Sequence, residues 1–265
     1  MNKQLLDELL PRIRTIAEAA GEAILQVAAE DLSVTEKCDR SPLTRADIVA
    51  DGIIRTGLDK LGSQFPILSE EGDLDNLAEK DWSTYWCVDP LDGTKEFINS
   101  LSDYTVNIAL VRASRPVLGV IDAPALGCAY WAARGLGAWK CRRGDQPERI
   151  TPSKCKNPAS AVVSRSHLDS DTEQFLEKLG VENAVPRGSS LKICAVADGS
   201  ADIYPRFGPT CLWDTAAGAA IAIEAGCTVV DLSARDLQYD PRQSIKHYGF
   251  IVSPAGMALA PAREP

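Results

Sequence analysis

The stretch that decides the fold reads Trp-Cys-Val-Asp-Pro-Leu-Asp-Gly-Thr and covers residues 86–94. The apolar run over 85–88 is typical of a buried strand, and the proline and the Asp-Gly pair that follow predict a turn at its end. Asp89 and Asp92, which are three residues apart, are therefore expected at the end of a rigid strand. Because Mg²⁺ prefers carboxylate and carbonyl oxygens, the pattern indicates a metal-binding turn, although such a turn alone is just as compatible with a structural role.

Around this stretch the hydrophobic periodicity predicts a mixed α/β chain. Helices are expected over 4–29, 44–61, 171–179, 190–198 and 214–225. Strands are expected at 66–69, 85–89, 106–112, 116–121, 128–133, 138–141, 161–164, 202–204, 227–231 and 250–253. The four strands from 106 to 141 resemble an antiparallel meander. A segment rich in Arg, Lys, Pro and Gly over 142–158 is the expected boundary between an N-terminal α+β half (1–150) and a C-terminal α/β half (151–265).

The composition excludes several classes of protein. A chain of 265 residues with 45% hydrophobic and 25% charged residues is typical of a globular protein with a sizeable core. Its formal net charge of −9 argues against binding to a nucleic acid polymer. No apolar run approaches the roughly 20 residues of an integral membrane segment. Eight cysteines without a CxxC pair favour reduced thiols and a cytoplasmic protein.

Further carboxylates stand at positions that suit a metal site. Glu70 directly follows the strand expected at 66–69, Asp214 opens an Ala-rich helix, and Asp47 follows Thr44 by three residues. Each also has an ordinary explanation, since Glu pairs are common in turns, an acid suits the first turn of a helix, and Thr44 with Asp47 can form a capping box. Together with Asp-Pro-Leu-Asp-Gly-Thr, the set favours one site built from both halves.

Two long motifs carry a resemblance to a known family. Residues 86–99 and 213–226 resemble the two signatures of the inositol monophosphatase superfamily, whose members are Mg²⁺-dependent, lithium-sensitive phosphomonoesterases. Cys227 departs from the Gly or Ala usual after the second motif, but it is also small. The resemblance implies an α/β fold, the layered αβαβα sandwich of the inositol monophosphatase and fructose-1,6-bisphosphatase type.

The resemblance also implies a set of metal ligands. One Mg²⁺ would be held by Glu70, Asp89 and the carbonyl oxygen of Leu91, and a second by Asp89, Asp92 and Asp214. Asp89 would bridge the two, and two or three ions are expected as cofactors. Paired metal ions of this kind activate water and stabilise the leaving oxygen of a phosphate ester.

A catalytic pair is implied as well. Thr94, hydrogen-bonded to Asp47, resembles the pair that orients and deprotonates the nucleophilic water in the family. Gly93 and Thr94 would also offer backbone N–H groups to the phosphate, the more so where Thr94 opens a short helix.

Four further segments suggest the substrate: residues 95–97, 164–167, 188–192 and 204–209 all resemble 3′(2′),5′-bisphosphate nucleotidases of the CysQ type. A nucleotide with a second, non-scissile phosphate needs cations distant from the metals. The implied substrate contacts are Gly93, Thr94, His167, Ser189, Lys192 and Arg206.

Each substrate residue keeps an alternative role. His167 can be a polar surface residue, Lys192 a solvated helix lysine with Ser189 as its N-cap, and Arg206 the partner of a neighbouring acid. The sequence leaves open the roles of four neighbours, namely Arg165, Ser166, Lys95 and Glu96.

The expected function is hydrolysis of adenosine 3′,5′-bisphosphate to AMP and phosphate by an Mg²⁺-dependent phosphomonoesterase. The alternatives are an inositol monophosphatase and a non-catalytic protein that binds Mg²⁺ or a nucleotide. The expected partner is a small nucleotide bisphosphate, and the expected state is a monomer or a homodimer, free in the cytoplasm or resting loosely on the inner membrane. Activity on the sulfated nucleotide stays open.

Overall fold

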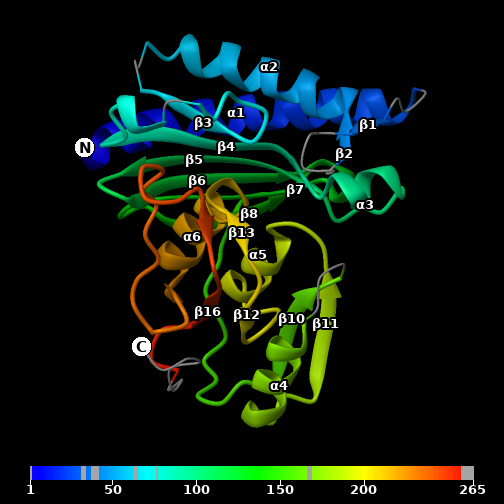
Figure 1. The fold of residues 1–265 in the computed structure, drawn as a ribbon, viewed down its shortest axis with the longest axis vertical. Helices are drawn as coiled ribbons and strands as arrows, with labels where there is room; N and C mark the ends of the chain where they lie inside the picture. The colour runs from blue at the N-terminus through cyan, green and yellow to red at the C-terminus, as the bar shows by residue number, and fades with distance from the viewer. Residues whose placement is uncertain are drawn as a thin grey trace.

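A seven-stranded sheet forms the centre of the protein in the computed structural model, which describes residues 2–30, 34–36, 42–62, 65–75, 77–165 and 169–257 (Figure 1). Its strands are β3 (Ile67–Ser69), β4 (Thr84–Asp92), β5 (Thr105–Arg112), β6 (Arg115–Ala123), β7 (Cys128–Ala133), β8 (Gly137–Arg142) and β9 (Glu148–Arg149). They lie in this order across the sheet; β3 runs parallel to β4, and every other pair is antiparallel. The predicted antiparallel meander is therefore confirmed.

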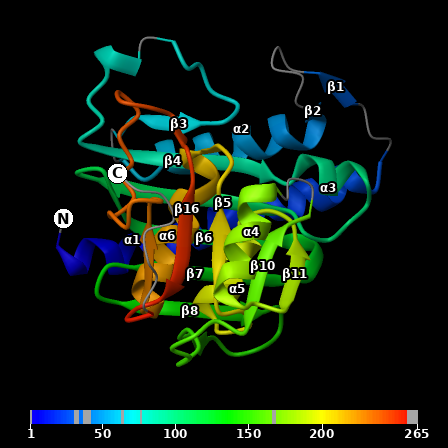
Figure 2. The same cartoon turned by 60° about the horizontal axis from the view of Figure 1, so that its bottom comes forward.

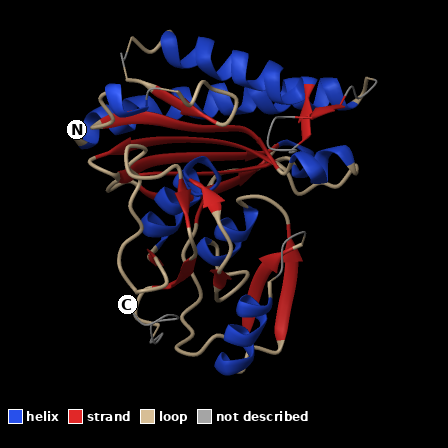
Figure 3. Cartoon of the chain, viewed as in Figure 1, coloured by secondary structure: helices blue, strands red, loops and turns tan. Residues whose placement is uncertain are grey.

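Helices cover both faces of this sheet, as the layers in Figure 3 show. α1 (Lys3–Ala28) and α2 (Arg45–Asp59) pack on one face, and α5 (Leu191–Ala197) and α6 (Leu212–Ala225) lie on the other side. α6 approaches so closely that a Cβ at Gly119 of β6 would lie 2.3 Å from the carbonyl oxygen of Ala217. The alanine-rich sequence of α6 permits this approach, because longer side chains would hold helix and sheet apart.

The C-terminal strands form a second, smaller layer beyond α5 and α6 (Figures 1 and 2). β12 (Tyr204–Arg206), β16 (Phe250–Pro254) and β14 (Cys227–Val230) make an antiparallel sheet in that order, and β10 (Ser160–Ser164) pairs in parallel with β11 (Asn183–Arg187). A bridge between Ala161 and Ile203 joins the two groups. α4 (Ser170–Leu179) packs on this layer through Leu176, which completes the predicted α-β-α-β-α order.

Short elements complete the chain. Two pairs are antiparallel, β1 with β2 and β13 with β15. The short elements are β1 (Val34–Glu36), β2 (Pro42–Thr44), η1 (Leu77–Glu79), α3 (Thr94–Ile98), η2 (Pro124–Leu126), β13 (Thr210–Cys211) and β15 (Lys246–His247). Thr94 opens a short helix, α3, which is the condition under which its backbone N–H is expected to suit a phosphate best.

The structure differs from the sequence prediction at several places, among them the bounds of two strands. The strand expected to end at Asp89 continues as β4 to Asp92. Its pairing with β5 shifts register between Asp89 and Asp92, and this irregularity accommodates Pro90. The helix expected over 4–29 is present as α1 although Pro11 lies inside it, since the buried face of that helix packs on the sheet. The strand expected over 202–204 is β12, two residues later.

Apolar side chains from both sequence halves share one core. A single cluster joins Cys87 of β4 and Ile121 of β6 to Ile193 of α5 and Ala217 of α6. The division at residue 150 therefore stays a prediction. Of the helices in the described ranges, none combines the length and the apolar character that crossing a membrane requires.

Candidate active site

The end of β4 supplies two carboxylates and a carbonyl group. Asp89 is 1% exposed, and its Oδ1 accepts a hydrogen bond of 3.1 Å from the backbone N–H of Leu91. The ladder to β5 pairs Asp89 with Asn107 and then shifts before it pairs Asp92 with Thr105. This irregularity at Pro90 and Leu91 displaces the strand end from regular pairing, and Leu91 lines one cavity together with the two aspartates.

Two other elements bring carboxylates to the same place. Glu70 follows β3, where its N–H donates to the Val88 carbonyl at 3.2 Å, so the parallel pairing sets it beside the end of β4. Asp214 lies in the first turn of α6, and its Oδ2 accepts hydrogen bonds from Thr210 Oγ1 at 2.7 Å and from Cys211 N at 2.9 Å. Ligand oxygens of Glu70, Asp89 and Asp214 all lie within 4.8 Å of one another.

Asp92 lies at the edge of this group and is fixed by the C-terminal half. Its Oδ2 accepts a hydrogen bond of 2.6 Å from Ser190 N and one of 3.2 Å from Asn107 Nδ2. Ser190 Oγ in turn donates to Asn107 Oδ1 at 2.8 Å. Both bonds to Asp92 use the same oxygen, which leaves Oδ1 for a ligand.

The electrostatics of this group fit a hard divalent cation. Burial raises the pKa of Asp89 well above its usual value, and the nearby charges of Glu70 and Asp92 raise it further. Burial together with the Asp214 carboxylate raises the pKa of Asp92 to about 7. Buried like charges of this kind are costly without a compensating cation. Oxygen-only donors with mutual repulsion are the ligand set that Mg²⁺ suits.

Thr94 and Asp47 form the predicted pair. Asp47 closes a capping box at the start of α2, in which its Oδ2 accepts from Thr44 N at 2.7 Å and from Thr44 Oγ1 at 2.6 Å. Its Oδ1 lies 3.3 Å from Thr94 Oγ1, and the Leu91 carbonyl lies 3.2 Å from the same hydroxyl. Thr94 can donate its proton to either oxygen, so the capping role of Asp47 and its contact with Thr94 coexist.

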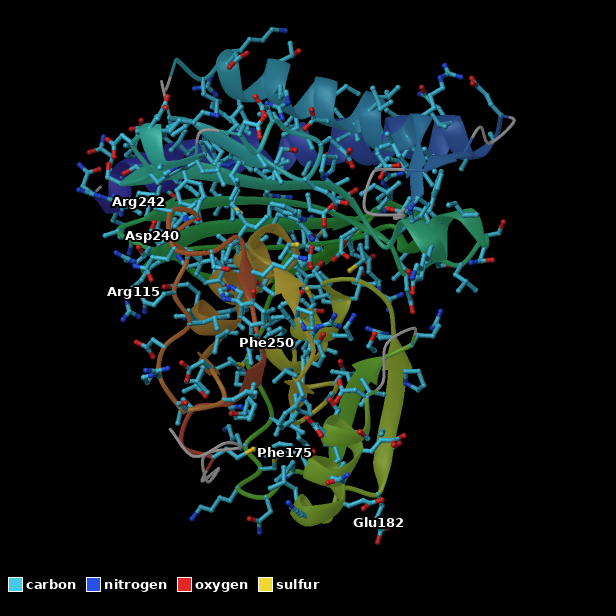
Figure 4. All side chains as sticks on the ribbon, viewed as in Figure 1. Arg115, Phe175, Glu182, Asp240, Arg242 and Phe250 are labelled. Atoms are coloured by element: carbon cyan, nitrogen blue, oxygen red, sulfur yellow. The ribbon has the colours of Figure 1, made fainter. Side chains whose placement is uncertain are left out.

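One cavity of about 590 Å³ unites these groups with the candidate substrate residues. Phe250 of β16, which is labelled near the middle of the view in Figure 4, contributes to its wall. The predicted residues that line it are Glu70, Asp89, Leu91, Asp92, Gly93, Thr94, Ser189, Lys192, Arg206 and Asp214. Lys95 and Glu96 line it too. His167 and Ser166 lie outside the described residues.

The two positively charged side chains proposed to bind substrate each donate a hydrogen bond to a backbone carbonyl oxygen. Lys192 is only 6% exposed, and its Nζ donates to the Ser189 carbonyl at 2.6 Å and lies 5.6 Å from the centre of the Tyr204 ring. The alternative of a solvated helix lysine is therefore wrong. Arg206 donates from Nη2 to the Pro209 carbonyl at 2.9 Å, and its buried Nε has no hydrogen-bond partner among the described residues.

Sequence reasoning missed the polar residues that hold the ligands. Thr105, Asn107 and Ser190 form a buried network, with 2.9 Å between Thr105 Oγ1 and Ser190 Oγ. Asn107 could have been noticed in the sequence, because it interrupts the apolar run over 106–111 in β5. No comparable pattern in the sequence marks Ser190 or Thr210.

Comparisons with known proteins agree with this architecture. A model of the inositol monophosphatase family matches residues 5–263. The 3′(2′),5′-bisphosphate nucleotidase CysQ of Shigella flexneri is 44% identical over 247 residues, which are 92% of this chain and 99% of that protein. The crystal structure of CysQ from Bacteroides thetaiotaomicron, described as a bacterial member of the inositol monophosphatase family, superposes with a TM-score of 0.81 at 41% identity and covers 93% of this chain and 97% of its own.

A more distant relative has the same fold. The IMPase TM1415 of Thermotoga maritima superposes with a TM-score of 0.77 at 26% identity, covering 94% of this chain and 93% of its own. The predicted fold and the predicted resemblance are therefore confirmed, and the chain belongs to the inositol monophosphatase family.

Proposed function

We propose that this protein is an Mg²⁺-dependent 3′(2′),5′-bisphosphate nucleotidase that converts adenosine 3′,5′-bisphosphate to AMP and phosphate. The observation that carries the proposal is the single cavity that holds the carboxylate group together with Lys192 and Arg206. An acidic protein needs such cations to accept a second phosphate away from its metal site. The nucleotidase relatives at 44% identity support the same substrate class.

The donor set supports the metal ligands that the family resemblance implies. Glu70, Asp89 and the Leu91 carbonyl would hold one Mg²⁺, and Asp89, Asp92 and Asp214 a second. The chemistry that bound Mg²⁺ would supply there is activation of water, polarisation of the phosphoryl group and stabilisation of the leaving oxygen.

The protein's own proton path runs through Thr94. Its hydroxyl would accept a proton from the attacking water while its own proton passes to Asp47 Oδ1, 3.3 Å away. The two hydrogen bonds from Thr44 fix the other oxygen of Asp47, so Oδ1 stays directed at Thr94. Gly93 and Thr94, which line the cavity at the start of α3, are the proposed contacts of the scissile phosphate.

The C-terminal side of the cavity would bind the non-scissile phosphate. Lys192 and Arg206 carry the positive charges, and Ser189 can add its hydroxyl. His167 remains a proposed contact on the ground of its motif alone. We also propose a cytoplasmic location, which the seven free cysteines of the described residues support.

The test is a substrate profile with Mg²⁺ present. We expect kcat/KM for adenosine 3′,5′-bisphosphate to exceed that for inositol-1-phosphate, and activity to vanish with EDTA and return with added Mg²⁺. A preference for the inositol ester would favour an inositol monophosphatase instead. Tight nucleotide binding without turnover of either ester would favour a non-catalytic binding protein.

A further inference from the structure

Asp103 connects the metal-binding side to the C-terminal strands. It lies in the loop between α3 and β5, and its Oδ2 accepts a hydrogen bond of 2.7 Å from Arg165 Nη2 and one of 3.2 Å from Gly188 N. Arg165 follows β10 and Gly188 follows β11, and these strands are paired in parallel up to their last residues. One carboxylate oxygen therefore holds the ends of both strands.

The backbone at Asp103 lies in close contact with two glycines, Gly188 and Gly93. A Cβ at Gly188 would lie 2.6 Å from the Asp103 carbonyl oxygen and 2.9 Å from Glu96 Cγ. A Cβ at Gly93, which has φ of +95°, would lie 3.0 Å from the same carbonyl oxygen. Only glycine allows contacts this close, so the position of Asp103 relative to α3 and to the turn after β11 is narrowly defined.

That turn carries the substrate residues. Ser189 has φ of +50°, which residues other than glycine rarely adopt. The contacts around it must therefore hold this backbone conformation in place. Gly188 is held by Asp103 on one side, and Ser190 is held by the candidate metal ligand Asp92 on the other. The Ser189 carbonyl between them accepts the hydrogen bond from Lys192 Nζ.

We propose that Asp103 is a positioning residue for the substrate, which sets Ser189 and Lys192 at a fixed place relative to the metal ligands through its bonds to Arg165 and Gly188. The side chains of Asp103 and Arg165 are 14% and 37% exposed, so water screens this ion pair less than a pair on the open surface. The inference rests on the proposed function for the identity of the substrate, and on the structure alone for the geometry of the turn.

Three variants test the role of the carboxylate. Asp103→Ala removes both bonds, Asp103→Asn keeps an acceptor for Gly188 N, and Arg165→Ala removes only the ion pair. We expect KM for adenosine 3′,5′-bisphosphate to rise about tenfold in Asp103→Ala and less in the other two, with kcat within about twofold. The double variant Asp103→Asn/Arg165→Ala should raise KM no further than the larger single effect, because both changes break one ion pair.

A matched ion pair supplies the control. Arg115 and Asp236 also lie 2.7 Å apart, and Figure 4 shows Arg115 on the opposite side of the molecule from α3. Asp236→Ala should leave KM and kcat unchanged. If Asp103→Ala left KM unchanged, or lowered kcat as strongly as it raised KM, the positioning role would be wrong.

Hydrogen exchange tests the geometry without any substrate. Asp103→Ala should speed exchange in a peptide that covers residues 188–191, and Asp236→Ala should not. Unchanged exchange in Asp103→Ala overturns the inference. Failure of the wild-type protein to hydrolyse the bisphosphate overturns the proposed function instead, so the two failures are distinguishable.

Discussion

The two sides of the cavity are built in different ways. On the metal-binding side, Asp89 and Asp92 end a nine-residue strand that is paired on both edges, and Glu70 follows its parallel neighbour. On the substrate side, Ser189 lies in a turn and Arg206 ends a three-residue strand. The difference indicates that the chemistry rests on a rigid sheet, while recognition depends on short segments that separate contacts must hold in place.

The largest effect is expected at the metal-binding side. Asp89→Asn should lower kcat/KM by more than about a thousandfold, because the proposed site loses the ligand that both ions share. Thermal unfolding with and without Mg²⁺ checks the cause: Mg²⁺ should raise the Tm of the wild-type protein but not of the variant. Without Mg²⁺ the variant should be at least as stable, since one of several repelling carboxylates is gone. Near-native activity in the variant would contradict the two-metal assignment.

The next effect concerns the proton path. Thr94→Val removes the hydroxyl and should lower kcat by about 10² to 10⁴ with little change in KM, whereas Thr94→Ser keeps the hydroxyl and should stay within about tenfold of the wild type. The measurement is kcat at saturating Mg²⁺. Near-native kcat in Thr94→Val would show that the hydroxyl is not needed and would contradict the proton path.

The metal-binding side was also the easier one to predict. Glu70 and Asp89 each follow an apolar strand, and Asp214 lies in the first turn of an apolar helix, so local patterns named them as candidates and the family resemblance then implied their roles. Asp103 and Ser190 were missed because their contacts join segments 62 or more residues apart and follow no local pattern.

The C-terminal layer was harder to predict for a similar reason. β11 was not expected, since its five residues are mostly exposed and include a proline and two strongly polar residues. The burial of Lys192 likewise depends on Tyr204 and on the turn before α5, which periodicity does not reveal.

A smaller effect is expected on the substrate side. Arg206→Ala should raise KM for adenosine 3′,5′-bisphosphate by about 10- to 100-fold with kcat nearly unchanged, because a charge-assisted contact to the non-scissile phosphate is lost. Steady-state kinetics on 3′-AMP, which lacks that phosphate, should show little change. Arg206→Lys keeps the charge and serves as the control. Equal losses on both nucleotides would place Arg206 at the scissile phosphate instead.

The smallest effect on activity is expected from a buried carboxyl on the far face of the large sheet. Asp122 of β6 is 6% exposed, and its Oδ2 has no hydrogen-bond partner among the described residues. A Cβ at Gly21 of α1 would lie 2.2 Å from this oxygen, so the helix lies directly against the carboxyl. Among the residues that the structure describes, the carboxylates grouped closely enough to hold a metal ion include Asp89 but not Asp122.

Burial raises the pKa of Asp122 from 3.8 to about 7, although the nearby charge of Arg143 opposes the shift. The folded state therefore holds a proton that the unfolded state releases between pH 4 and 7, and the free energy of unfolding falls as the pH rises through this window, by up to about 4 kcal/mol. Asp122→Asn should remove this loss and leave kcat unchanged. Urea unfolding at pH 5 and pH 8 measures the difference, and an equal pH dependence in both proteins would show that Asp122 is ionised in the folded state.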